Sequence, residues 1–166
     1  MTQRTLVILR HAKADRPAGV ADLDRPLTER GHADAAAAGA WLTSRGYRPE
    51  LVLCSPARRT RQTWHGVAVA LAGSAAPEVH YEAALYYEDA DEALDLIRGV
   101  PEGVGSVLVI GHNPGLSALS SMLDRSAGQD SDSLRTSGIA VHRRDGEWTG
   151  YARGTAPVVA THTARA

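Results

Sequence analysis

Residues 6–11 of the chain are LVILRH, a run of four apolar residues followed by two polar ones. Two later stretches have the same form: LVLCSP at 51–56 and VLVIGHNPG at 107–115. Short apolar runs of this kind are typical of strands that are buried on both faces of a parallel sheet. Because the carboxyl ends of parallel strands meet at one edge of the sheet, we expect the polar residues that follow the three runs to lie together.

Segments of helical periodicity alternate with these runs. In each segment apolar residues recur every three or four positions, which predicts a helix with one buried face. The predicted faces are Ala33, Ala36, Ala37, Ala40 and Trp41; Trp64, Val67, Ala68 and Leu71; Ala90, Ala93, Leu94 and Ile97; and Leu116, Leu119 and Leu123. Strands that alternate with helices predict an α/β fold, here a three-layer α/β/α sandwich with a mainly parallel central sheet.

The C-terminal part has a different pattern. Residues 139–142 and 148–151, separated by Asp145-Gly146, are expected to form a closing antiparallel hairpin. A length of 166 residues fits one domain, which we place at 1–154, with 155–166 as a C-terminal tail. Residues 126–133 are rich in Ser, Asp and Gly and are expected to form a mobile loop.

Several helix boundaries can also be predicted. Thr28 and Asp89 are suited to cap the first and third helices, and Arg45-Gly46 marks the end of the first. Ser55-Pro56 and Asn113-Pro114 each place a capping side chain before a proline, so helices are expected to start there. Their N-terminal N–H groups would then face the carboxyl edge of the sheet.

Composition excludes several classes of function. The chain has 18 basic and 19 acidic residues, a net charge of −1, so no overall positive field attracts nucleic acid or an anionic membrane. The single cysteine, Cys54, lies in an apolar run and is expected to be a buried thiol, which fits a cytoplasmic location. The histidines at positions 32, 65, 80, 142 and 162 lack the spacing of metal ligands, so no metal site is expected.

The predicted edge gathers several cationic side chains. Such groups repel one another unless an anion joins them, and a phosphoryl group matches the forked donors of arginine. His11 lies directly after its strand, and the adjacent Arg10 disfavours the imidazolium, so we expect a neutral ring that can attack phosphorus. The group comprises Arg10, His11, His112 and one or more of Arg58, Arg59 and Arg61.

Four blocks carry a resemblance to a known family: LRHAKA at 9–14, DLDRPLT at 22–28 with Gly31, SPARRTRQT at 55–63 and GHNPGL at 111–116. Together they resemble the histidine phosphatase superfamily, and within it the small phosphohistidine phosphatases of the SixA type. The resemblance implies a phosphoglycerate-mutase-like fold and an enzyme without metal or cofactor. It also implies that His11 is the phospho-accepting nucleophile. Of the three candidate arginines, it selects Arg59, rather than Arg58 or Arg61, as the second arginine that binds phosphate in the catalytic group with Arg10 and His112. We expect Arg10, Arg59, His112 and Asn113 to bind the phosphate.

The chain departs from the superfamily pattern at two positions. Ala12 stands where most members have glycine, and Glu82 aligns only loosely with the general-acid glutamate of members that cleave phosphate esters. Glu82, Asp22 and Asp24 remain the candidates for an acid, and Asp24 could instead pair with Arg25. An alkoxide leaving group has a conjugate acid with a pKa near the ~15.7 of water, so it needs an acid to protonate it. The conjugate acid of imidazole has a pKa of about 6.5, so an imidazole leaving group needs such help far less. A weakly defined acid therefore favours a P–N substrate.

The sequence thus predicts a phosphatase that removes phosphate from phosphohistidine, through a covalent phosphohistidine on His11. Because no long insertion is available to form a lid, an open pocket is expected, which suits a phosphorylated side chain on a partner protein such as a phosphotransfer domain. Two alternatives stay open: a phosphatase of small phosphate esters that uses the same nucleophile, and a phosphate-binding module without turnover.

Overall fold

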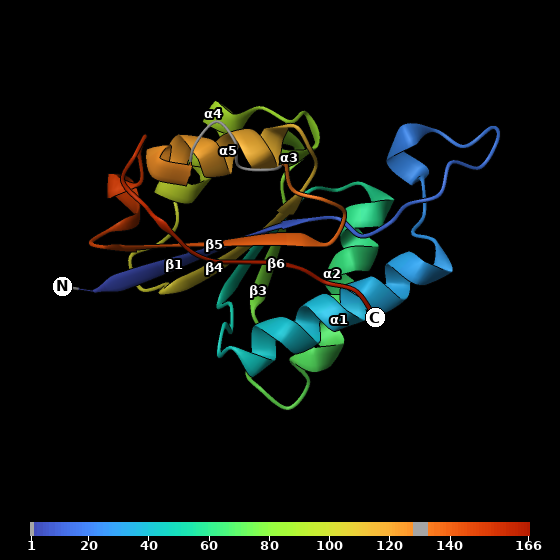
Figure 1. The fold of residues 1–166 in the computed structure, drawn as a ribbon, viewed down its shortest axis with the longest axis horizontal. Coiled ribbons are helices and arrows are strands. Elements are labelled where there is room, and N and C mark those ends of the chain that lie inside the picture. The colour runs from blue at the N-terminus through green and yellow to red at the C-terminus, as the bar shows by residue number, and fades with distance from the viewer. Residues whose placement is uncertain (1, 128–132) are drawn as a thin grey trace.

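A computed structural model describes residues 2–127 and 133–166 and has the predicted three layers (Figure 1). The central sheet has the strand order β3-β2-β4-β1-β5-β6. The first four strands in this order run parallel, and β5 and β6 are antiparallel to their neighbours. Their bounds are β1 (Gln3–Arg10), β2 (Leu51–Cys54), β3 (Glu78–Tyr81), β4 (Ser106–Gly111), β5 (Gly138–Asp145) and β6 (Val158–Thr163). The predicted α/β fold with a mainly parallel sheet is confirmed.

Helices cover both faces of the sheet (Figure 1). One face carries α1 (Glu29–Ser44) and α2 (Arg58–Ala70), and the other carries α3 (Ala83–Tyr86), α4 (Ala90–Arg98) and α5 (Gly115–Leu123). Successive residues of β1 enter opposite cores: Leu6 and Ile8 pack towards α4 and α5, and Val7 and Leu9 towards α1 and α2. This two-sided burial is the reason that the strand is apolar throughout rather than alternating.

The closing hairpin differs from the prediction. β5 pairs with β6, whereas residues Trp148–Gly150 form the 3-10 turn η3. Trp148 and Tyr151 stack with ring centroids 5.1 Å apart and are fully buried, because their polar atoms reach the backbone carbonyls of Val104 and Arg4. The prediction that 155–166 is only a tail is therefore wrong: β6 is an edge strand, half-exposed along its length, and so lacks the apolar run that identified β1.

The buried face of α1 was predicted correctly only in part: Ala37 and Trp41 pack against the core and are partly buried. Ala35, Ala38 and Leu42 are buried, whereas Ala33, Ala36 and Ala40 are exposed. Alanine occurs on every side of this helix, so its periodicity does not identify one face. The contact with α2 decides which face of α1 is buried. A Cβ on Gly39 would lie 2.6 Å from the carbonyl oxygen of Val67, and only glycine permits such a close approach.

Helix ends are partly as predicted. Thr28 Oγ1 accepts from Gly31 N and Asp89 accepts from Glu92 N, which confirms both caps. The expected start at Ser55-Pro56 is wrong, because α2 begins at Arg58 after the N-cap Ala57. Of the loop predicted at 126–133, residues 128–132 lie outside the described chain, and Arg125–Ala127 form the 3-10 turn η2. The edge strand β3 was not predicted, since only Val79 of its four residues is an aliphatic core former.

Candidate active site

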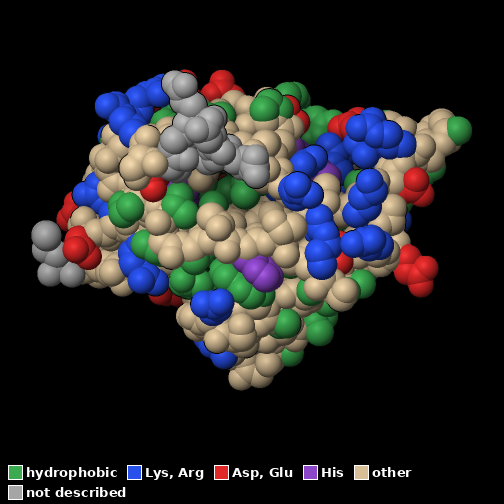
Figure 2. Space-filling view, in the orientation of Figure 1, with side chains coloured by type: hydrophobic (Ala, Val, Ile, Leu, Met, Phe, Trp, Pro, Cys, Tyr) green, Lys and Arg blue, Asp and Glu red, His purple; other side chains and the backbone are tan. Residues whose placement is uncertain are grey.

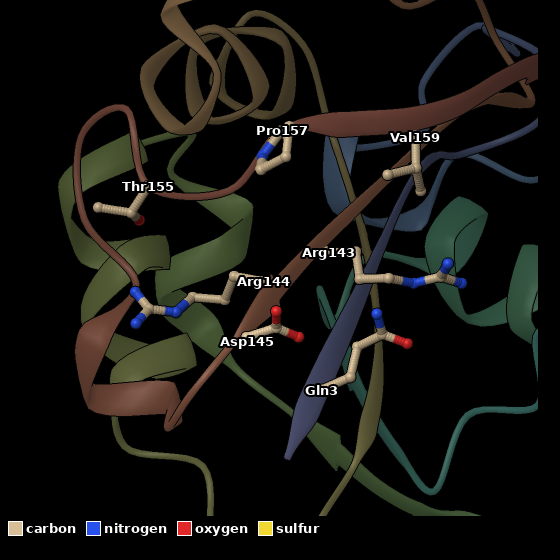
Figure 3. A pocket seen from close by; sticks show the side chains of 7 residues that line it. All are labelled: Gln3, Arg143, Arg144, Asp145, Thr155, Pro157 and Val159. Carbon is tan, nitrogen blue, oxygen red and sulfur yellow. The ribbon is translucent and has the colours of Figure 1, made fainter. Parts of the chain in front are cut away.

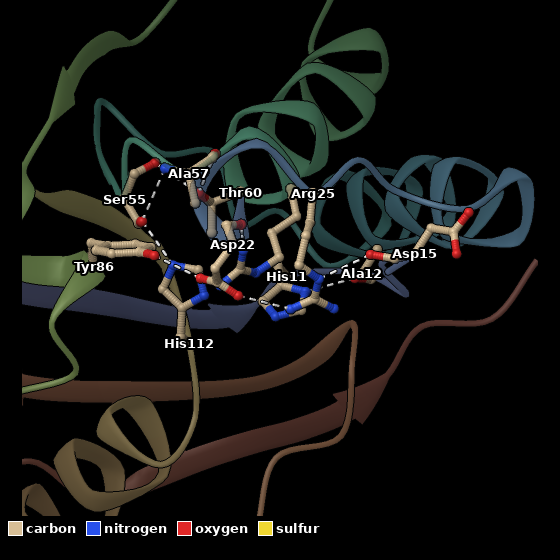
Figure 4. Close-up of polar contacts among 11 residues, drawn as sticks. His11, Ala12, Asp15, Asp22, Arg25, Ser55, Ala57, Thr60, Tyr86 and His112 are labelled. Carbon is tan, nitrogen blue, oxygen red and sulfur yellow. Dashed lines mark hydrogen bonds and ion pairs between the residues drawn. The ribbon is translucent and has the colours of Figure 1, made fainter. Parts of the chain in front are cut away.

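The carboxyl edge of the sheet brings the two predicted histidines together. β1 ends at Arg10, directly beside Gly111 of β4, so His11 and His112 follow neighbouring parallel strands. Their ring centroids are 5.3 Å apart, and both side chains are buried. The parallel arrangement of the strands therefore places residues about a hundred positions apart in one site (Figure 4).

The chemistry of His11 follows from its backbone contacts. Its Nδ1–H donates to the carbonyl oxygen of Ala12 at 2.7 Å, and the Ala12 N–H donates to Thr63 Oγ1 at 3.0 Å. Because a neutral imidazole carries one proton, Nε2 is the nitrogen with the available lone pair. Burial lowers the pKa of His11 to about 4, helped by the positive charges of Arg59 and Arg10. The ring is therefore neutral at physiological pH and can act as a nucleophile.

His112 is held by Ser55, whose hydroxyl lies 2.8 Å from His112 Nε2. Ser55 Oγ accepts from the N–H of Ala57, and among the described residues His112 Nε2 is the acceptor available to its proton, so we assign that proton to the bond with Nε2. The remaining ring nitrogen, Nδ1, then carries the proton and is a donor. Burial lowers the pKa of His112 to about 3, with His11 and Arg59 adding to the shift, so this ring is also neutral.

Arg59 projects from the first turn of α2 and is buried, whereas its neighbour Arg58 is exposed. Its guanidinium is fixed by one residue, Asp22 of the 3-10 turn η1 (Asp22–Asp24). Arg59 Nη1 donates to the Asp22 carbonyl at 2.7 Å, and Nη2 donates to Asp22 Oδ2 at 3.1 Å. The choice of Arg59 over Arg58 and Arg61 agrees with this placement, because Arg61 is also exposed.

Arg10 is fixed from the opposite side, where its Nη1 donates to the carbonyl of Leu134 at 3.0 Å. The same carbonyl accepts from Asn113 Nδ2 at 2.6 Å, while Asn113 Oδ1 accepts from Ser117. The expectation that Asn113 binds phosphate is therefore corrected: both ends of its amide are engaged within the protein. Asn113 instead anchors the carbonyl that orients Arg10.

Within the described residues, three of the buried nitrogens without a hydrogen-bond partner belong to the site; Arg4, Arg143 and Arg144 each have an unpaired Nε elsewhere. The three nitrogens of the site are Arg10 Nε, Arg59 Nε and His112 Nδ1. Buried donors are normally paired, and each unpaired group is costly. Two guanidinium groups whose charges act on His11, together with the neutral ring of His112, fit a tetrahedral oxyanion such as a phosphoryl group better than a neutral ligand.

The acid candidates occupy different places. Asp22 is in the site, bonded to Arg59, to Tyr86 and to Arg25 (Figure 4). Asp24 is exposed, and the predicted pairing of Arg25 with Asp24 is wrong, because Arg25 bonds Asp22 at 3.1 Å. Glu82 precedes α3, where its backbone N–H donates to Cys54. The α3 side chain that reaches the site is Tyr86.

Sequence reasoning missed the roles of Ser55 and Tyr86. Tyr86 Oη donates to Asp22 Oδ2 at 2.6 Å, and its ring lies edge-on to His112 with centroids 5.7 Å apart. The strand-end position of Ser55 predicts that it lies near the site, but the sequence assigns it only a capping role and not the bond to His112. Nothing in the sequence around Tyr86 indicates a role in the site. Ala12 lies outside the left-handed region of backbone conformation, so this position does not require glycine.

A separate hollow of about 570 Å³ lies at the opposite end of the sheet, around Gln3, Arg143 and Arg144 (Figure 3). The two guanidinium groups point in different directions and lie over the rings of Tyr47 and Tyr151. The lining of this hollow shares no residue with the His11 site. Within the described residues, no group of three or more His, Cys, Asp or Glu side chains could hold a metal ion. None of the described helices has the length and apolar character to span a bilayer.

The lowered histidine pKa values predict that stability falls with acid. Unfolded imidazoles titrate near 6.5, whereas folded His11 and His112 stay unprotonated to about 4 and 3. Between about pH 6.5 and 4 the unfolded state binds more protons, so the free energy of unfolding decreases as pH falls. Urea unfolding at several pH values checks this, and a His11→Asn variant should show a shallower decrease. A free energy of unfolding that stays constant or increases over this range contradicts the prediction.

Comparison with known proteins places the chain in a family. The sequence model that describes the histidine phosphatase superfamily (branch 1) matches residues 6–86 of the chain. An uncharacterized protein of Mycobacterium tuberculosis is 39% identical over 164 residues, covering 95% of this chain and 100% of the relative. The structure of a candidate phosphohistidine phosphatase SixA from Nakamurella multipartitia is 34% identical, with a TM-score of 0.82, and covers 99% of this chain and 98% of that one. The structure of the protein histidine phosphatase SixA complexed with tungstate is 29% identical, with a TM-score of 0.78 and 96% of each chain covered.

These comparisons define a phosphatase with an α/β fold. The chain belongs to the histidine phosphatase superfamily, in its SixA-type branch, and has the phosphoglycerate-mutase-like fold.

Proposed function

We propose that the protein removes phosphate from phosphohistidine side chains of a partner protein, through a phosphohistidine on its own His11. The observation that carries the proposal is the hydrogen bond from His11 Nδ1–H to Ala12, which leaves Nε2 free beside Arg10 and Arg59. The SixA relative solved with tungstate, a tetrahedral oxyanion, supports a pocket of this kind.

In the first step, His11 Nε2 forms a bond to phosphorus while the P–N bond of the substrate breaks. The electron pair of that bond stays on the substrate nitrogen. Arg10, Arg59 and His112 donate to the equatorial oxygens, whose charge rearranges in the transition state. These donors are already held by Leu134, Asp22 and Ser55, so little reorganisation is needed.

In the second step, water attacks the phosphorus of phospho-His11. His11 leaves as a neutral imidazole because its Nδ1 proton stays bonded to the Ala12 carbonyl, and the proton of the water leaves with the phosphate. The same backbone contact therefore supports both steps. It makes Nε2 a nucleophile in the first and a good leaving group in the second.

A P–N substrate is favoured over an ester by the state of Asp22. Hydrogen bonds from Tyr86, and also from Arg25 and Arg59, hold the pKa of this carboxyl well below its ordinary range. Asp22 is therefore ionised at neutral pH and has no proton to give to an alkoxide. A leaving imidazole does not need one to the same degree.

A protein substrate is favoured by the basic rim, which we define as Lys13, Arg30, Arg135 and Arg165. These four side chains are exposed, and Figure 2 shows Lys and Arg gathering over this end of the molecule. Arg135 follows Leu134, the residue that orients Arg10, and Arg165 bonds the carbonyl of Thr136. Arg30 and Arg165 share one buried carboxylate, that of Asp34, so the rim keeps an excess of positive charge in a chain with a net charge of −1, which suits an acidic phosphoprotein.

A substrate panel tests the proposal. We expect kcat/KM on a phosphohistidine-bearing phosphotransfer domain to exceed that on a small alkyl phosphate by about 100-fold or more. Raising the salt concentration from about 50 to about 500 mM should lower kcat/KM on the phosphoprotein several-fold and kcat/KM on the alkyl phosphate much less. Salt screens the charges of the exposed basic rim, which only the phosphoprotein contacts. High efficiency on the ester with none on the phosphoprotein contradicts the proposal and favours the small-molecule phosphatase. Binding of phosphate without any turnover favours the non-catalytic module.

A further inference from the structure

The Asp22 carboxylate has an unusual setting for a group at the entrance of an anion site. Its side chain is 51% exposed, yet it is bonded by residues from three different segments. Oδ2 accepts from Arg59 Nη2 of α2 and from Tyr86 Oη of α3, and Oδ1 accepts from Arg25 Nη1. Figure 4 shows the carboxylate with Tyr86 on one side and Arg25 on the other. These contacts hold the Asp22 carboxylate in place at the site, and the carboxylate can still accept a further hydrogen bond.

A count of acceptor positions supports this statement. A carboxylate has about four lone-pair sites. Two on Oδ2 and one on Oδ1 are occupied by the three donors above, which leaves one on Oδ1. Half of the Asp22 side chain is exposed, so a ligand can reach the carboxylate from solvent.

The proposed reaction needs such an acceptor on the substrate side. When the P–N bond breaks, the substrate ring leaves as neutral imidazole only if its far nitrogen already carries a proton; otherwise it must leave as an anion. Because an ordinary imidazole has a pKa of about 6.5, most phosphohistidine rings lack the proton on the far nitrogen above neutral pH. For its own His11 the protein supplies an acceptor for the far N–H, the Ala12 carbonyl.

We propose that Asp22 supplies the equivalent acceptor for the substrate: its carboxylate accepts a hydrogen bond from the far N–H of the phosphohistidine ring and so selects a P–N substrate. This inference rests on the proposed function. In the step, the His11 Nε2–P bond forms, the P–N bond breaks with its electron pair remaining on the substrate nitrogen, and the far nitrogen keeps its proton. Asp22 is unprotonated before and after. It therefore differs from a general acid, which would give up a proton.

The groups around Asp22 decide how it affects pH dependence. Arg59 and Arg25 are cationic, Tyr86 donates its hydroxyl proton, and His112 is neutral. None of these four groups is an anion; Glu88, the other carboxylate near the site, acts on Arg10 rather than on Asp22. Removing the charge of Asp22 therefore lowers the pKa of the bound substrate ring, and the alkaline limb of activity on phosphohistidine moves to lower pH.

The experiment measures kcat and KM from about pH 5 to about pH 9 on a phosphohistidine peptide and on p-nitrophenyl phosphate. The second substrate has no ring nitrogen to hold. In Asp22→Asn, the ratio of kcat on the peptide to kcat on the aryl phosphate should fall by about 10- to 100-fold, the effect of one hydrogen bond to a charged group. The alkaline limb for the peptide should move down by about one pH unit.

Two further variants make the test specific. Asp24→Asn makes the same chemical change two residues away on an exposed side chain outside the site, and should leave the ratio and the limb unchanged. Asp22→Glu keeps an anion and should retain more of the ratio than Asp22→Asn, which keeps the test decisive if the asparagine variant is inactive.

The remaining outcomes overturn the inference. Equal losses on both substrates mean that Asp22 only positions Arg59. Gains on both substrates mean that Asp22 competes with phosphate. If the unchanged protein cleaves the aryl phosphate but not the peptide, the proposed function fails and this inference fails with it, whereas an unaltered ratio in Asp22→Asn with an active parent refutes this inference alone.

Discussion

Replacing His11 with alanine is expected to lower kcat by about 10⁴- to 10⁶-fold, because the variant lacks the atom that bonds phosphorus. Initial rates on a phosphohistidine peptide give the measurement. His65→Ala is the matched control, since His65 is an exposed histidine on α2, and it should keep the parental rate. A His11→Ala enzyme within about tenfold of the parent would mean that water attacks the substrate directly.

Replacing Arg59 with alanine should lower kcat by about 10²- to 10³-fold, the loss typical of one preorganised donor to transition-state charge. The same change removes a cationic donor to the bound oxyanion and one of the three partners of Asp22, so affinity for vanadate should weaken as well. Arg58→Ala is the control, because Arg58 is the adjacent residue and is exposed.

Thermal unfolding of both arginine variants separates a catalytic loss from a folding defect. Equal kinetic losses in Arg58→Ala and Arg59→Ala would contradict the assignment of Arg59 to the pocket. The buried position of Arg59 predicts a measurable loss of stability in its variant, and the kinetic effect must exceed what the unfolded fraction explains.

The features predicted well from the sequence are those that local pattern determines. A strand buried on both faces must be apolar throughout, so Leu6–Leu9 could be identified without knowledge of its neighbours. The parallel direction of three such strands then placed His11 and His112 at one edge. That inference needed no distance information, because strand polarity alone determines which ends meet.

The features that were missed depend on contacts between distant segments. The hydroxyl of Tyr86 reaches Asp22 across 64 positions, and Ser55 reaches His112 across 57, and neither contact has a sequence period. Likewise, the buried face of α1 is decided by the close approach to α2 at Gly39. The edge strand β6 is stabilised by pairing with β5 rather than by its own hydrophobicity.

The central claim is that phosphate passes through Nε2 of His11. Rapid quenching during turnover of a ³²P-labelled phosphohistidine substrate tests it most directly. We predict a protein-bound label that is lost in acid, survives alkali and maps to the peptide containing His11. Full turnover with no label on the protein, or a label on another residue, would contradict the account.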